Sequence, residues 1–314
     1  MATEGGTVTG IDPTGGFLYS SAMTLRRLVC ILTASVLATA IAGCAHLISH
    51  SGLPGGMAAS MMGSGADSGL PTRSEVAAGQ LVIHADFQIA GQHRLVRELD
   101  TLRADVSQEL GLPISDEPVH LYLFDSTARY DAFVARQYPT FPARRAFFVE
   151  TDTTLSVFAV WQERVAEDLR HETTHGYVHA VVPAVPLWLD EGIAEFFETP
   201  RNERGLHHGH VAHLAGRLLE GTWRPDLERL DALGSPGEMS QDHYAEAWCW
   251  VHWLLRTTPE RRELLQNYLV AIRRDPDTPP LSTVLRHELG SPGDASADVK
   301  EHLSRLAAAA AAER

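Results

Sequence analysis

Hydrophobic positions between residues 80 and 124 follow two different periods. Residues 80–87 (QLVIHADF) alternate between apolar and polar positions, and residues 118–124 (PVHLYLF) are rich in apolar and aromatic side chains. Both patterns are typical of β-strands. Between them, apolar residues recur every three to four positions, which predicts a helix: Leu95, Leu99, Leu102, Val106 and Leu110.

The rest of the chain changes character near residue 161. Residues 126–137 predict a helix, and residues 145–160 predict two strands about a turn near Asp152. After residue 161 the pattern is helical almost throughout. Strands followed by helices indicate an α+β domain, with a small mixed sheet and a mainly helical C-terminal half. We expect this domain to span 76–308, followed by an alanine-rich tail at 309–314.

The motif H-E-x-x-H lies at the start of the helical half. His171 and His175 are four residues apart, so on a helix both imidazoles lie on one face and can reach one zinc ion at about 2.0–2.1 Å. Glu172 projects beside them and can take a proton from water at the metal without being a ligand. Helical character is supported by the apolar residues Val165, Leu169, Tyr177 and Val178.

A second helix is predicted within residues 185–200 (VPLWLDEGIAEFFETP), where Asp190 is a good N-cap residue. The two segments together resemble the gluzincin metallopeptidases, in which H-E-x-x-H is followed by a helix bearing W-L-x-E-G-x-A-E. The resemblance implies a zincin-like fold whose sheet packs on the active-site helix. It also implies one zinc ion per chain, with Glu191 as the third ligand beside His171 and His175.

Other side chains could complete the coordination. His179 lies eight residues beyond His171, about 12 Å along a helix, so we expect it to pack or line the cleft. The metzincin pattern fails, because it requires glycine and histidine where this chain has Val178 and Val181. Asp190 stays an alternative ligand. The third ligand could also come from the group His207, His208, His210 and His213.

Two supporting roles are predicted around the metal. Glu195 lies one turn beyond Glu191, so its carboxylate is our candidate for holding the ring of a metal-binding histidine, whereas Glu198 is expected on the surface. In similar gluzincin-like proteins a later helix presents a Tyr or a His to the substrate carbonyl. This resemblance implies Tyr244 as the hydrogen-bond donor, with His243 as the alternative.

The N-terminal region reads as a targeting segment. Two arginines after Met23, an apolar run and a small-residue exit before Cys44 give the layout of a secretory signal at 23–43. The ending IAGC resembles the lipobox of bacterial lipoproteins, which implies lipidation of Cys44 and anchoring at the cell-envelope membrane. Residues 44–75 read as a flexible tether. Residues 1–22 look like a non-native extension.

Net charge and cysteine content exclude some classes of function and structure. The formal net charge of −14 argues against a nucleic-acid-binding surface. Cys249 is the single cysteine beyond the predicted lipid site, so an internal disulfide is excluded from the exported domain and a buried thiol is expected. The sequence therefore predicts a membrane-tethered zinc hydrolase acting on peptide or protein substrates. Alternatives are a non-catalytic zincin-like surface lipoprotein and, because of the 16 histidines, a periplasmic zinc-binding protein.

Overall fold

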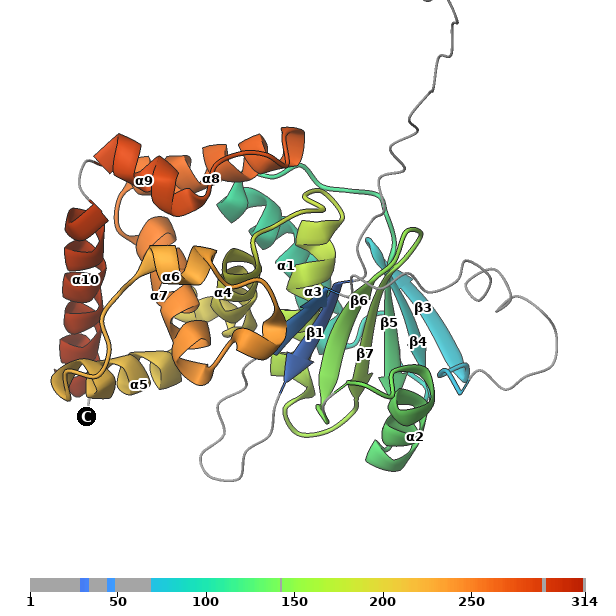
Figure 1. The fold of residues 1–314 in the computed structure, drawn as a ribbon. Helices are drawn as coiled ribbons and strands as arrows, with labels where there is room; N and C mark the ends of the chain where they lie inside the picture. Colours follow the sequence, from blue (N-terminus) through green and yellow to red (C-terminus); the bar gives the residue numbers. More distant parts are fainter. Residues whose placement is uncertain (1–28, 34–43, 49–68, 142, 290–291, 313–314) are drawn as a thin grey trace, which may run out of the picture.

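The computed structural model describes residues 29–33, 44–48, 69–141, 143–289 and 292–312. Within these residues the fold is α+β, as expected from the sequence. Figure 1 shows the sheet on one side of the molecule and the helices α4 to α10 on the other. No helix in the described part combines the length and apolar character needed to cross a bilayer.

The strands of the described residues form one mixed sheet in the order β2-β1-β6-β7-β5-β4-β3. The central pairs β4–β5 and β5–β7 are parallel, and the other pairs are antiparallel. The strands are β1 (Val29–Thr33), β2 (Cys44–Ile48), β3 (Ser74–Ala78), β4 (Leu81–Ala85), β5 (Val119–Phe124), β6 (Ala146–Glu150) and β7 (Leu155–Val160).

Helices cover both faces of the sheet and build the C-terminal half (Figure 1). Those associated with the sheet are α1 (Arg94–Leu110), α2 (Thr127–Gln137) and α3 (Val165–His179). Those of the C-terminal half are α4 (Leu187–Glu198), η2 (Arg201–Glu203), α5 (His208–Leu219), α6 (Leu227–Asp231), η3 (Pro236–Glu238), α7 (Gln241–Arg256), α8 (Pro259–Arg274), α9 (Leu281–Leu289) and α10 (Pro292–Ala312).

Strand β7 shows why the sheet is apolar on both faces. Successive side chains of a strand point to opposite faces. Val157 and Ala159 join the large core shared with α1 and α3, whereas Phe158 and Val160 pack with the aromatic residues of α2. A strand covered on both sides reads as an unbroken apolar run, and for this reason its sequence carries little alternation.

The predicted elements agree with the structure where periodicity was strong. Each of the five apolar positions that predicted the first helix is buried in α1. The strands at 80–87 and 118–124 correspond to β4 and β5, and the pair at 145–160 to β6 and β7. Strand β3 was missed. Its first residue lies just before the boundary predicted at residue 76, in a sequence, SEVAA, whose side chains are half-buried or exposed.

The N-terminal assignments are only partly within the described residues. The predicted extension, 1–22, lies outside them, as does most of the predicted signal and tether. Parts of the signal and tether, β1 and β2, pair with each other, and β1 pairs antiparallel with β6. Signal cleavage and the lipidation of Cys44 stay predictions. At the other end, α10 continues to Ala312, through most of the segment assigned to a tail.

Candidate metal centre

Helix α3 brings the two motif histidines together in the interior. His171 and His175 are 2% and 0% exposed, and their ring centroids are 5.0 Å apart. The helix can lie close to the sheet because Gly176 faces β5, where an added Cβ would come within 2.7 Å of a Val119 methyl group. The position of α3 against the sheet and the four-residue spacing thus bring the two imidazoles side by side in the interior.

Helix α4 adds the third donor. Oε2 of Glu191 lies 3.6 Å from Nε2 of His171 and 3.9 Å from Nε2 of His175. Ligand atoms of the three side chains all lie within 4.8 Å of one another. Donors of a tetrahedral zinc site are about 3.4 Å apart when each bond is about 2.1 Å. Two imidazole nitrogens and a carboxylate oxygen at this separation fit a zinc ion.

A close helix contact sets the position of Glu191. A Cβ on the neighbouring residue, Gly192, would lie 2.6 Å from the backbone oxygen of Ala247 in α7. Real Cβ atoms do not approach so closely, so only glycine permits this spacing of α4 and α7. The glycine of the W-L-x-E-G pattern therefore serves packing in this chain.

Two carboxylates hold the rings of the motif histidines. Nδ1 of His171 lies 2.9 Å from Oε2 of Glu198, and Nδ1 of His175 lies 3.0 Å from Oδ1 of Asp190. Assigned as a donor to Glu198, the Nδ1–H of His171 leaves its Nε2 lone pair on the side of Glu191. A histidine that binds a metal through Nε2 requires this tautomer.

The structure differs from two sequence expectations here. Glu198 was expected on the surface and is 2% exposed, because the end of α4 lies against His171. Asp190 was expected to cap its helix. Helix α4 instead begins at Leu187, with Pro186 as the N-cap, and the amide of Asp190 already donates to the Pro186 oxygen at 3.0 Å. The side chain of Asp190 is therefore available to α3.

Glu195 is buried beside the same cluster, with a different hydrogen-bond partner from the predicted one. Its Oε2 lies 2.8 Å from Nε2 of His210, on α5. Burial, and next the negative charge of Glu198, raise the pKa of Glu195 well above its usual range. For Glu198 burial acts in the same direction, but hydrogen bonds from His171 and His207 outweigh it and hold the pKa of Glu198 below its usual value.

Glu172 lies next to the donors and is 1% exposed. Burial raises the pKa of its carboxyl group to about 8, with a smaller opposing effect from His171 and a smaller raising effect from Glu191. A cation held by the neighbouring donors would lower this pKa, because a nearby positive charge favours the carboxylate. The side chain is therefore able to exchange a proton near neutral pH.

His179 contacts two carboxylates and is not one of the three donors His171, His175 and Glu191. Its Nδ1 lies 2.8 Å from Oε2 of Glu150 and its Nε2 lies 2.8 Å from Oδ2 of Asp190. Burial alone lowers the pKa of His179, but the charges and hydrogen bonds of Asp190 and Glu150 outweigh burial and raise it to about 10. This agrees with its expected packing role, and Asp190 consequently joins His175 to His179.

The histidines around residue 210 divide into two kinds. His207 and His210 lie near Glu195, and the three side chains offer donor atoms within 4.8 Å of one another. His208 and His213 lie apart from this group and pair with Glu203 and Asp242, respectively. The sequence did not distinguish the inner pair from the outer pair.

The two candidates for the substrate-facing donor differ in their surroundings. His243 belongs to a capping box at the start of α7, where its Nδ1 lies 3.1 Å from the amide of Ser240. Tyr244 is 4% exposed in the first turn of the same helix. The role of Tyr244 toward a substrate stays a prediction. Cys249, further along α7, is buried as expected, and burial raises the pKa of its thiol.

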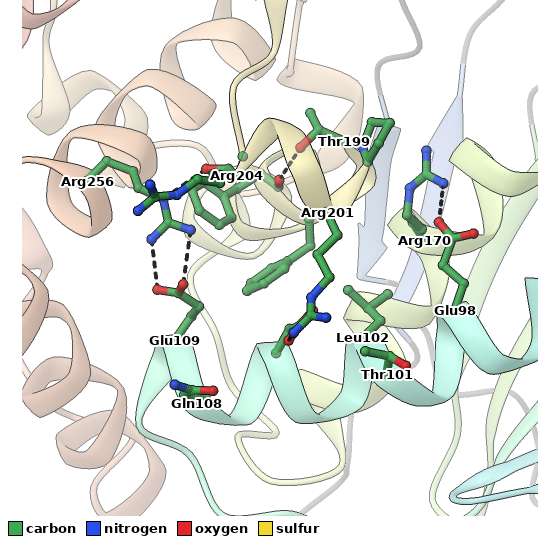
Figure 2. A pocket seen from close by; sticks show the side chains of 15 residues that line it. Glu98, Thr101, Leu102, Gln108, Glu109, Arg170, Thr199, Arg201, Arg204 and Arg256 are labelled. Atoms are coloured by element: carbon green, nitrogen blue, oxygen red, sulfur yellow. Dashed lines mark hydrogen bonds and ion pairs between the residues drawn. The ribbon is translucent and has the colours of Figure 1, made fainter.

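A cavity of 480 Å³ lies beside the end of α4, between α1 and η2 (Figure 2). Figure 2 shows Arg170 directed toward Glu98, with Nη1 2.7 Å from Oε1. Nε of Arg170 also donates to the backbone oxygen of Glu198 at 2.5 Å. None of the three donors around Glu191 lines this cavity. The cavity is therefore distinct from the cluster of His171, His175 and Glu191. Arg170 lines the cavity and, through Glu198, contacts the surroundings of that cluster.

A family described as a protein of unknown function, DUF1570, matches residues 165–277, the segment from α3 to α8. No curated protein matches the chain. Among solved structures, the chain is similar to the crystal structure of an M1 zinc metallopeptidase from Deinococcus radiodurans, with 20% identity and a TM-score of 0.40. The similarity covers 73% of this chain and 50% of that chain, so this protein spans about half of its length.

Proposed function

We propose that this chain is a zincin-like zinc metallopeptidase tethered to the bacterial cell envelope. The observation that carries the proposal is the buried set of two imidazoles and one carboxylate from α3 and α4, with Glu172 immediately beside it. In this proposal His171, His175 and Glu191 hold one zinc ion. Three protein ligands leave a fourth position for water or substrate, as in catalytic zinc sites.

The proposed reaction assigns each side chain a separate task. Zinc bound at this site would supply a Lewis acid that activates water and polarises a carbonyl group. Glu172 takes the proton of the attacking water and returns it to the leaving amine. Glu198 and Asp190 keep the rings of His171 and His175 oriented. Tyr244 is the proposed donor to the oxygen that becomes negatively charged.

A peptide substrate is supported by the edge of the sheet next to α3. Strand β6 accepts β1 as an antiparallel neighbour, with Val29 opposite Glu150 and Cys30 opposite Val149. On β6, the ring of Phe148 lies 6.1 Å from that of His175. If the predicted signal is removed, β1 leaves with it. An extended peptide could then add to the same edge, since main-chain hydrogen bonds supply the affinity of strand addition.

A second candidate function is a non-catalytic binding module with the same fold. Its support is the depth of the site, because His171, Glu172, His175 and Glu191 are each at most 2% exposed. A deeply buried ion could stabilise the fold without turnover. The two functions differ in what they require of Glu172, which only catalysis needs as a base.

The test is cleavage of a peptide library by the full chain and two variants with matched chemistry. Glu172→Gln removes the proposed base, and Glu167→Gln changes a partly exposed carboxylate in the first turn of the same helix. We expect cleavage by wild type and Glu167→Gln, and none by Glu172→Gln carrying the same zinc. Full activity of Glu172→Gln would exclude the mechanism. Zinc-loaded wild type that cleaves no peptide would favour the binding module.

The tether is tested separately, in a bacterial host. We expect the wild-type chain to incorporate a labelled fatty acid and to partition with membranes. Cys44→Ser should lose both properties, whereas Cys30→Ser, within the predicted signal, should keep them. Equal labelling of wild type and Cys44→Ser would exclude the proposed anchor.

A further inference from the structure

His207 immediately precedes α5, and a hydrogen bond from the backbone determines which nitrogen of its ring carries the proton. His207 is the N-cap of α5, and its Nδ1 accepts the backbone N–H of His210 at 3.0 Å. A backbone N–H can only donate, so Nδ1 must present a lone pair. The ring is therefore neutral, and its proton is on Nε2.

The other nitrogen of His207 faces the carboxylate that holds a motif histidine. Nε2 of His207 lies 3.0 Å from Oε1 of Glu198, so its N–H donates to this oxygen. The second oxygen of Glu198 lies 2.9 Å from Nδ1 of His171. The hydrogen bond from His207 to Oε1 favours the carboxylate form of Glu198, and in that form Oε2 accepts the proton on Nδ1 of His171. The lone pair of His171 is then on Nε2, on the side of Glu191.

Packing fixes the orientation of the His207 ring. It stacks on His210 with centroids 3.8 Å apart and planes inclined by 20°, and it meets Trp248 edge-on at 6.3 Å. The side chain of His207 is 16% exposed, whereas those of Glu198 and His171 are 3% and 2% exposed. His207 is thus the point at which this buried chain of hydrogen bonds comes closest to solvent.

We propose that His207 is a positioning residue for the metal centre, acting on His171 through Glu198. The proposal rests on the proposed function. The amide of His210 orients the ring of His207, His207 donates to Oε1 of Glu198, and Oε2 of Glu198 holds the ring of His171 with Nε2 on the side of Glu191.

The test separates this role from the cap of α5. His207→Asn keeps a good N-cap residue, but its side chain is too short to reach Glu198. His207→Gln has a longer side chain with an amide donor, and it serves as the conservative rescue. His208→Asn is the matched control, since His208 is 54% exposed and pairs with Glu203. A double-variant cycle adds Glu198→Gln alone and with His207→Asn.

Two readouts are used on the full chain. In metal-free protein labelled with ¹⁵N-histidine, we expect one His171 tautomer, protonated at Nδ1, in wild type and His208→Asn. His207→Asn should give ring shifts averaged between tautomers, and His207→Gln should restore the wild-type pattern. In a zinc competition titration with a chelator, His207→Asn should bind about tenfold more weakly, with no further loss when Glu198→Gln is already present.

Either of two results would overturn the proposal. One is an unchanged His171 tautomer in His207→Asn, and the other is a loss of zinc affinity that is equally large with and without Glu198→Gln. Wild-type protein that binds no zinc would instead contradict the proposed function. The comparison of tautomers, made without metal, would still decide the role of His207.

Discussion

Nδ1 of His171 lies 2.9 Å from Oε2 of Glu198, two helical turns along α4 from Glu191. One helix thus supplies both the proposed third ligand and the carboxylate that orients the first. Glu195 lies between them on α4, and its Oε2 forms a hydrogen bond with Nε2 of His210 on α5. These three glutamates of α4 therefore make different contacts, although each is buried.

The first prediction compares Glu198→Gln with Glu195→Gln. Removing the charge that orients His171 should weaken zinc binding about 10- to 100-fold. Glu195→Gln should have a smaller effect, because its hydrogen-bond partner is not a proposed ligand. The dissociation constants are measured by competition with a chelator. A greater loss of affinity in Glu195→Gln than in Glu198→Gln would contradict this division of tasks.

The second prediction concerns the contact of α4 with α7. Gly192→Ala places a Cβ 2.6 Å from the Ala247 oxygen, so the helices must separate, and we expect a loss of about 1–3 kcal/mol in unfolding free energy. The control is Gly216→Ala, in α5, where an added Cβ meets nothing within 4 Å. It should be neutral or stabilise the protein by up to about 1 kcal/mol. Urea denaturation of metal-free protein measures both, and equal effects would refute the packing role.

The third prediction is a loss of stability in acid. Nδ1 of His252 lies 2.9 Å from Nε2 of His302, and the residues are 5% and 6% exposed. Burial, with smaller effects from nearby cationic groups, lowers the pKa of His252 to about 3 and that of His302 to about 4. An unfolded histidine titrates near pH 6.5, at about its unperturbed pKa. The unfolded state therefore binds more protons between these values, and stability is lost as the pH falls from about 6.5 toward 3.

His302→Gln removes one of the two groups and so should make this pH dependence shallower. The expected reduction approaches about 1.4 kcal/mol per pH unit, the effect of one proton, in metal-free protein between pH 6 and 4.5. The measurement is the unfolding free energy as a function of pH. His287→Gln is the control, because His287 is exposed, with 86% of its side chain accessible. Identical slopes for wild type and His302→Gln would show that the buried pair does not cause the acid sensitivity.

Strong periodicity made much of the fold predictable from the sequence. The apolar stripe of α1 and the runs of β5 and β7 correspond to buried positions, since burial on one or two faces leaves a direct trace in the pattern. Strand β3 left no such trace, because it lies at the edge of the sheet and its side chains are only partly buried. Edge position depends on pairing with β4, which the residues of β3 do not encode by themselves.

The surroundings of the candidate site were harder to predict than its proposed donors. His171 and His175 lie four residues apart in one helix, so their proximity follows directly from the sequence. Glu198 is followed by Thr-Pro at the end of a helix, a setting that resembles a surface, yet His171 and His207 enclose it. These partners are 27 and 9 residues away in sequence. A buried carboxylate is recognisable only when its partners are known, and they come from separate helices.

The central claim is that His171, His175 and Glu191 form a zinc site, and the most direct measurement is the zinc content of the purified full chain. Elemental analysis should find about one zinc per chain in wild type and in His208→Ala, whose exposed ring lies outside the proposed donor set. His175→Ala should retain almost none, with circular dichroism confirming that it is folded. Equal zinc content in wild type and folded His175→Ala, whether none or one per chain, would contradict the account.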